Sequence, residues 1–285
     1  MDKESILRCS FDKWYTPLRS ETIRSYIIPL PPDLIKFLLE GDFVLPPEGT
    51  PSPYPEIEKK VSEILEYELD GMAFPKLNFT APTDAKGIAP NRIIVVKSFL
   101  DVLRLLKAST RVLIDIIKPF GTEIEGLQPI LVLKRWFNYR QEREFRAFIK
   151  DKTTYCITSR YPHLASTVPP EKLQNLFIPF IESISSKYNV DKLILDFYVS
   201  PKERLHIIDL APWNDLTSPG LYTWEEIENL QNVDVRISDE DSFAPPEDDA
   251  VPEELLGGVS YEEILASMKI LDEDIDESQI PSFDI

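Results

Sequence analysis

The sequence predicts an α+β protein whose strands pair mainly antiparallel, and three observations lead to this prediction. Hydrophobic residues make up 43% of the 285 residues, which is enough for a packed core. Runs typical of strands are mixed with runs at helical spacing, without the regular alternation of a parallel sheet. Two pairs of successive strand-like runs are joined by short turns, as in β-hairpins.

Turn and capping residues bound each expected element. A proline-rich connector at 45–55 precedes the first helix, and Gly71 ends it. Residues 111–117 fit a strand or a helix equally well, and Asp151-Lys152 is expected to form a two-residue hairpin turn. In chain order we expect a helix over 57–69, strands over 72–78 and 92–97, a helix capped by Ser98, a strand over 130–137, a hairpin of 144–150 and 153–159, a helix after Pro169-Pro170, a hairpin of 192–199 and 204–210, and a helix capped by Thr223.

Charge divides the chain into a body and a tail. The sequence has 31 basic and 49 acidic residues, a formal net charge of −18. Residues 239–285 contain 16 acidic residues and one basic residue, a net of −15, so −18 + 15 leaves −3 for residues 1–238. We therefore expect a nearly neutral body, 1–238, and an acidic C-terminal tail, 239–285. Such a tail either stays solvated or packs on the body or on a basic partner.

Composition also excludes several classes of protein. A body without excess basic charge is not suited to bind duplex DNA, so no direct nucleic-acid partner is expected. No apolar run approaches the roughly 20 residues that span a bilayer, and the charged start lacks a signal-peptide core. Cys9 and Cys156 form no spacing motif. We therefore expect a cytoplasmic protein with no membrane partner.

The last hairpin brings two aspartates together. If its loop is the four residues Pro201–Arg204, Ser200 faces Leu205 and Asp196 lies directly opposite Asp209. Two carboxylates there, embedded in apolar strands, destabilise the pair unless something offsets their charges. A shared proton or a Mg²⁺ ion would do so, whereas strand-end aspartates that face solvent would need neither. A loop longer or shorter by one residue would send the two side chains to opposite faces.

Basic residues interrupt or end several apolar strands. If they met the two aspartates on one face, they would form a pocket for a polyphosphate and a metal; otherwise they are edge residues or surface ion pairs. Neither GxxxxGK[ST] nor GxGxxG occurs, so a nucleotide site needs another design. The residues are Lys76, Lys97, Lys134, Arg135, Arg160 and Arg146, which shares a strand face with Glu144.

Six motifs occur along the body: CSFDKWY at 9–15, FPKLNF at 74–79, LVLKRW at 131–136, EFRAF at 144–148, IDLAP at 208–212 and TWEE at 223–226. Together they resemble the cell division cycle protein 123 family, closely enough to suggest a fungal orthologue. That family is similar to ATP-grasp proteins. The resemblance implies two α+β lobes with largely antiparallel sheets and ATP between them. The smaller lobe would be roughly 53–128, and the larger lobe roughly 1–52 plus 129–238.

The resemblance also implies a role for individual residues. Lys76 would meet the α- and β-phosphates, Arg146 would approach the phosphates, and Glu144 would lie at the ribose hydroxyls. Asp196 and Asp209 would be the Mg²⁺ ligands. The hinge that meets adenine through backbone groups would be Lys134, Arg135, Trp136 and Phe137.

Two departures from the ATP-grasp pattern stand out. At the last strand those enzymes usually present an acid-x-Asn pair, whereas this chain has Ala211 in the Asn place. Alanine cannot bind a cation, so that role is vacant or passes to Asn214 or to water. The stretch 79–87 is poor in glycine, so a flap whose backbone amides cradle phosphates must be shortened or replaced.

The function that the resemblance implies is that of an ATP- and Mg²⁺-binding assembly chaperone. It would bind the γ subunit of eukaryotic translation initiation factor 2 (eIF2) and promote assembly of the heterotrimer, and hence translation initiation and cell-cycle progression. Trp14, Tyr15 and Trp213 are candidates either for the partner surface or for ordinary packing. The alternatives are an ATP-dependent carboxylate–amine ligase, for which no second substrate pocket is identifiable, and an acidic scaffold that ignores nucleotide.

Overall fold

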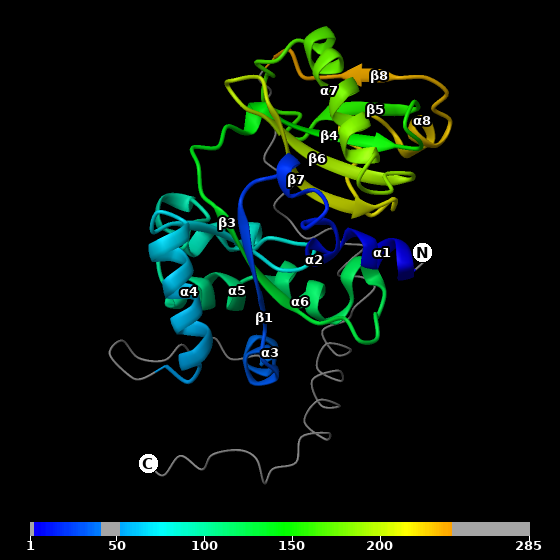
Figure 1. The fold of residues 1–285 in the computed structure, drawn as a ribbon. Helices are drawn as coiled ribbons and strands as arrows, with labels where there is room; N and C mark the ends of the chain where they lie inside the picture. The colour runs from blue at the N-terminus through cyan, green and yellow to red at the C-terminus, as the bar shows by residue number, and fades with distance from the viewer. Residues whose placement is uncertain (1–2, 41–51, 241–285) are drawn as a thin grey trace, which may run out of the picture.

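The computed structural model describes residues 3–40 and 52–240, so nearly all of the expected tail lies outside the described residues. Two lobes are visible in Figure 1, one around a three-stranded sheet and one around a five-stranded sheet. The strands are β1 (Ser25–Pro29), β2 (Ala73–Lys76), β3 (Ile130–Arg135), β4 (Glu144–Ile149), β5 (Tyr155–Ser159), β6 (Leu193–Val199), β7 (Leu205–Pro212) and β8 (Asp234–Arg236). The α-helices are α1 (Lys3–Cys9), α2 (Phe11–Trp14), α3 (Pro32–Leu39), α4 (Pro55–Glu68), α5 (Phe99–Lys107), α6 (Thr110–Ile117), α7 (Pro170–Ser185) and α8 (Trp224–Glu228).

The smaller lobe is built on the antiparallel sheet β1-β3-β2. Its core joins apolar residues of α3, α4 and α5 to Leu131 and Leu133 of β3. β1, α3 and β3 therefore belong to this lobe, whereas the expected boundaries placed them in the larger one. The undecided segment 111–117 is helical. The strand expected over 92–97 is reduced to a single bridge, in which Val96 and Ala73 exchange backbone hydrogen bonds of 2.9 and 3.0 Å.

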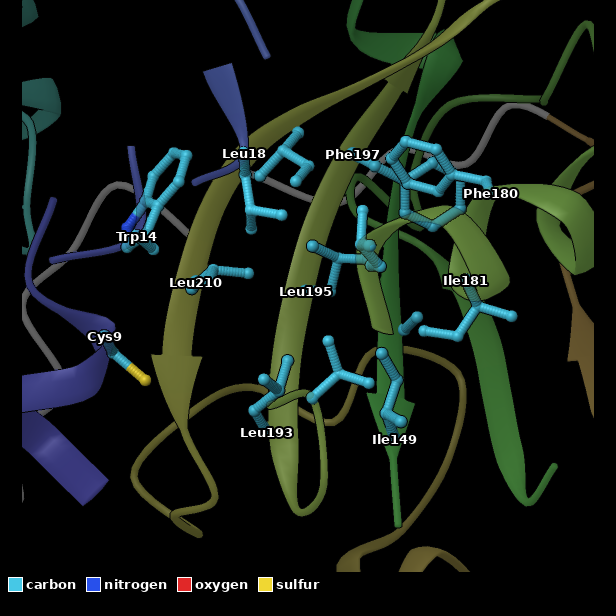
Figure 2. Close-up of a cluster of buried hydrophobic side chains, with 14 of the residues drawn as sticks. Cys9, Trp14, Leu18, Ile149, Phe180, Ile181, Leu193, Leu195, Phe197 and Leu210 are labelled. Atoms are coloured by element: carbon cyan, nitrogen blue, oxygen red, sulfur yellow. The ribbon is translucent and has the colours of Figure 1, made fainter. Parts of the chain in front are cut away.

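The larger lobe is built on a sheet of order β7-β6-β4-β5-β8, in which only the β5–β8 pair is parallel. Alternate residues of β6, such as Leu195 and Phe197, face α7, because successive side chains of a strand point to opposite faces. Figure 2 shows Phe180 and Ile181 of α7 packed on this face. The expected α+β class, two lobes and largely antiparallel sheets are confirmed.

The N-terminal segment joins the same core from the far end of the sheet (Figure 2). Trp14 is fully buried and Tyr15 nearly so, so of the two alternatives that the sequence left open both residues serve packing and not a partner surface. Thr22 forms a parallel bridge with Ile207 of β7, and its hydroxyl donates to the Ile207 carbonyl at 2.7 Å. This segment thus ties the beginning of the body to one of its last strands.

The β6–β7 hairpin pairs Asp196 with Asp209, as the sequence predicts, although by a different route. Its turn is longer than expected, because Val199 rather than Ser200 faces Leu205. The register then shifts between Asp196 and Phe197, where Ile208 is the extra residue of a β-bulge. The longer turn and the bulge cancel, and the two aspartates lie opposite each other on the face away from α7.

Candidate functional site

A cavity of about 1450 Å³ lies between the two lobes, and we call it the interlobe cavity. Its walls come from β2, β3, the segment after β3, β4, β6, β7 and the loop after β7. The structure brings every residue of the predicted site to these walls: Lys76, Lys134, Arg135, Trp136, Phe137, Glu144, Arg146, Asp196 and Asp209. Of the other basic residues noted in the sequence, Arg160 lines the cavity as well.

The larger lobe contributes a row of charged side chains across neighbouring strands. Arg146 on β4 lies directly opposite Asp196 on β6 and donates to both of its carboxylate oxygens, at 2.7 and 2.8 Å. Arg160 approaches Asp196 to 3.4 Å and Glu144 to 4.0 Å. Asp209 on β7 continues the row beyond Asp196. Two fork-shaped guanidinium groups thus hold the charge of Asp196.

The smaller lobe supplies two lysines to the interlobe cavity. The Lys76 ammonium is almost fully buried and forms an ion pair with Asp209, so this pair joins the two lobes. Lys134 donates to the backbone carbonyl of Ile208 at 2.6 Å, which is the carbonyl at the bulge. Both ammonium groups lie over the ring of Phe11, at 5.3 and 5.4 Å from its centroid.

These cations offset the negative charges of the paired aspartates. Each carboxylate already has a cationic partner: Arg146 and Arg160 for Asp196, and Lys76 for Asp209. Their mutual repulsion therefore does not by itself require a metal. Within 3–40 and 52–240, no group of three or more His, Cys, Asp or Glu side chains is arranged to hold a metal ion. A divalent cation at this site would need oxygens of the ligand itself, as phosphates supply.

Burial sets the protonation chemistry of the cavity. It lowers the pKa of Lys134 to about 7, and neighbouring Lys76 acts in the same direction. It raises the pKa of Glu144 to about 8, against the opposing charge of Arg160. Burial also raises the pKa of Asp209, although Lys76 opposes it. At Asp196, Arg146 and Arg160 outweigh burial, and the pKa lies below its ordinary value.

The segment after β3 has two distinct sides. The Arg135 side chain points away and reaches Asp70 of the smaller lobe at 2.5 Å, so only its backbone is available to a ligand in the cavity. Trp136 and Phe137 are partly buried in the cavity wall. Phe137 packs edge-on against Tyr198 of β6, with ring centroids 5.2 Å apart. An apolar wall at this end suits a flat aromatic ring, and the charged row suits phosphates.

Asp115 of α6 is a cavity residue that the sequence reasoning missed. It is buried, and one carboxylate oxygen accepts from the backbone amides of Phe79 and Thr80, at 3.0 and 2.6 Å, and from the Thr80 hydroxyl at 2.7 Å. Burial raises its pKa to about 6, against the opposing hydrogen bond from Thr80. The sequence feature that could have identified it is an acidic residue inside the apolar run 112–117. Because an internal carboxylate occupies these amides, they cannot cradle a phosphate.

The Asn place of the ATP-grasp pattern is occupied by Ala211, and Asn214 is not placed to replace it. Ala211 lines the cavity without a side-chain oxygen. The side-chain oxygen of Asn214 accepts from the backbone amide of Leu216 at 2.8 Å, and Asn214 lines a neighbouring cavity instead. The idea that Asn214 takes over this role is therefore not supported by its position.

The chain is similar to one protein family over most of its length and to several named proteins of other organisms. The D123 family model matches residues 50–256. A translation initiation factor eIF2 assembly protein of Emericella nidulans is 28% identical over 281 residues, which cover 84% of this chain and 68% of that protein. A protein of the same name from Danio rerio is 27% identical over 286 residues, 86% of this chain and 81% of its own. Fungal and vertebrate relatives thus match about equally.

A solved structure has the same fold. C-terminally truncated Cdc123 from Schizosaccharomyces pombe superposes with a TM-score of 0.75 at 25% identity, over 84% of this chain and 99% of that one. The motif-based resemblance is thereby confirmed. Because the family model covers more than half of its residues, the chain belongs to the D123 family.

Proposed function

We propose that this protein binds ATP with Mg²⁺ in the interlobe cavity and, in that state, serves as an assembly chaperone that binds the γ subunit of eIF2. One observation carries the nucleotide part of the proposal: residues far apart in the sequence, from both lobes, converge on one cavity with an apolar end and a charged end. The names of the relatives carry the eIF2 part. A cytoplasmic location and a link through translation initiation to cell division belong to the same proposal.

The charged end has the chemistry of a triphosphate site. Lys76, Lys134, Arg146 and Arg160 surround it, and the two arginines have the fork geometry that phosphate oxygens favour. The backbone of 134–137 would meet adenine. Glu144 would accept hydrogen bonds from the ribose hydroxyls when it is charged and could donate one when it is protonated. Since the amides of Phe79 and Thr80 are engaged by Asp115, side chains rather than a glycine-rich flap would hold the phosphates.

Asp196 and Asp209 would be the carboxylates that hold Mg²⁺. They lie on adjacent strands and face the cavity. Lys76 has two anionic partners available in this site, Asp209 and a phosphate. When it turns to the phosphate, Asp209 becomes free to act as a ligand. Bound Mg²⁺ would supply charge neutralisation at the phosphates, with the remaining ligands coming from phosphate oxygens and water.

A ligase, the alternative left open by the sequence, would need a second pocket for its acid substrate, and one cavity adjoins the interlobe cavity. That neighbouring cavity is walled by tryptophans and acids, among them Glu225 and Glu228. A carboxylate substrate would be repelled there, so this cavity favours the chaperone.

The test is calorimetric titration with ATP·Mg²⁺ of the wild type, Lys76→Met and Asp209→Asn. Each variant is expected to lose affinity about tenfold or more, since each removes a charge-assisted contact. Arg135→Ala is the matched control: its side chain points to Asp70, and affinity should stay within about threefold. Equal affinity in all four proteins would show that the site is misplaced.

Folding must be separated from binding, because removing one partner of a buried ion pair costs about 3–5 kcal/mol. The double variant Lys76→Met/Asp209→Asn removes both charges and should regain part of the lost stability without regaining ATP affinity. Phosphate release with and without candidate acceptors then separates chaperone from ligase: turnover that depends on an acceptor would favour the ligase.

A further inference from the structure

A second cavity, of about 820 Å³, adjoins the interlobe cavity, and we call it the tryptophan cavity. Phe120, Asp215 and Leu216 line both, so the loop after β7 separates the two. α1, the segment after η4 (Pro119–Gly121) and α8 complete its walls. The proposed ATP site does not use it.

Two indole rings form the apolar part of this cavity. Trp213 and Trp224 meet edge to face, with centroids 5.9 Å apart, and both rest on Phe148 of β4. The indole nitrogens are engaged, at 2.5 Å with Glu228 and at 3.0 Å with the Thr217 carbonyl, so the rings are held in place. Both tryptophans are only partly buried, which leaves ring surface open to the cavity.

Acidic side chains surround these rings. Asp215, Glu225 and Glu228 line the cavity and are exposed, against one lysine, Lys192. The side chains of Asp215 and Glu225 have no ion-pair or hydrogen-bond partner within the described part of the chain. Aromatic faces attract cations, and fixed carboxylates beside them strengthen that attraction.

We propose that the tryptophan cavity is a docking site for a basic segment of a protein partner, which inserts an arginine or lysine side chain against Trp213 and Trp224. Charge complementarity selects this occupant: three acids against one lysine repel acidic segments and attract basic ones. Arginine against tryptophan is also a pairing typical of energetically dominant interface residues. The inference rests on the proposed function only in naming the partner, the protein whose assembly is assisted.

The first experiment does not require that partner. A fluorescein-labelled peptide of alternating glycine and arginine is titrated into the full chain at physiological salt, and binding is followed by anisotropy. Asp215→Asn/Glu225→Gln should weaken binding about tenfold, because both carboxylates without a partner among the described residues are lost. Glu171→Gln/Glu182→Gln, the same charge change on exposed α7 positions, should leave affinity within about twofold.

A second readout places the peptide. In protein labelled with ¹⁵N at tryptophan, the indole signals of Trp213 and Trp224, assigned through Trp213→Phe and Trp224→Phe, should shift on peptide addition, whereas that of buried Trp14 should not. Equal loss in both double variants would reveal unspecific attraction to acids and overturn the proposal. So would the absence of peptide binding, or preferential binding of a glycine–glutamate peptide.

The third arm separates this inference from the proposed function. Purified eIF2 γ subunit is captured on each variant with ATP·Mg²⁺ present. Capture by the wild type and the α7 variant but not by Asp215→Asn/Glu225→Gln supports the docking site. Equal capture by all would overturn it while leaving the proposed function intact. Failure of the wild type to capture the γ subunit would count against the proposed function, and the peptide result would still decide the cavity.

Discussion

At the scale of single residues, Lys134 shows how burial changes the charge state of a side chain. Its ammonium is held by the Ile208 carbonyl and lies next to Lys76. Burial and that neighbouring cation lower its pKa to about 7, so near neutral pH its charge is poised between two states. A phosphate in the cavity would favour the protonated form, because the added negative charge stabilises the cation.

ATP affinity should therefore fall as pH rises through 7. From pH 6 to pH 8 Lys134 changes from mostly cationic to mostly neutral, and Glu144, whose pKa is about 8, begins to gain negative charge. Both changes act in the same direction, and we expect a loss of about five- to tenfold. Calorimetry at the two pH values measures it. Lys134→Met should show a clearly smaller change; an equal change in both proteins would assign the dependence to other groups.

At the scale of elements, the β-bulge at Ile208 decides where the chemistry lies. It turns Asp209 to the face of Asp196, and it offers the carbonyl that accepts from Lys134. A regular hairpin with the observed turn would pair Asp196 with Ile208 and direct Asp209 to the opposite face, toward the core.

Deleting Ile208 should thus remove the bulge while keeping the aspartate pair. Asp209 would follow Ile207 directly and meet Asp196 in regular register, so we expect ATP affinity to stay within about threefold. Asp209→Asn, which keeps the bulge but removes the charge, should lose about tenfold in affinity. Circular dichroism and thermal melts verify the folding of both variants. A loss above tenfold after the deletion would show that the Ile208 carbonyl, which accepts from Lys134, is needed for the site.

The same hairpin shows what the sequence could and could not predict. Strand existence and the Asp196–Asp209 pairing were predictable, but only because a misjudged turn and an unforeseen bulge compensated. The lobe boundary was not predictable: β1 and β3 are identifiable as strands, yet their pairing, for example Ile28 with Leu131, joins residues far apart in sequence. An apolar run at 92–97 resembles a strand, although only Val96 finds a partner.

The residues of the candidate site were likewise predictable from the sequence only in part. Lys76, Arg146 and the aspartates interrupt or end apolar strands, which is a signal visible in the sequence. Asp115 lies in a helix, and its partners are backbone amides of residues 79 and 80, which no side-chain pattern reveals. The tryptophan cavity is formed where several separate segments meet, so only the fold brings its residues together.

At the scale of the whole molecule, the ion pair Lys76–Asp209 and the hydrogen bond from Lys134 to Ile208 join the two lobes across the interlobe cavity. A ligand that contacts both walls should therefore stabilise their arrangement. ATP·Mg²⁺ at about 100 times its Kd should add about 2.7 kcal/mol. For a body of this size that corresponds to a rise in Tm of about 5–10 °C. A thermal shift assay with Lys76→Met/Asp209→Asn as control checks this, and no shift in the wild type would contradict it.

The effect that we expect of the acidic tail also belongs to this scale. Truncation after Ser238 leaves a body with a formal charge of −3 in place of −18. We expect weaker binding of the eIF2 γ subunit, mainly through slower association, and a larger loss at low salt than at high salt. Surface plasmon resonance at two salt concentrations measures both rates, with ATP affinity as the internal control. Unchanged binding at both salts would exclude a role for the tail in recognition.

The bridge between Thr22 and Ile207 has a consequence for the making of the protein. Residues around Trp14 and Thr22 leave the ribosome long before β7, on which they pack. Until then Trp14 and Leu18, which are fully buried in the folded protein, have no core to pack on, and closure of such a distant contact slows folding. Biogenesis of this protein should accordingly depend on helpers that shield nascent chains, and its yield should respond to the rate of translation.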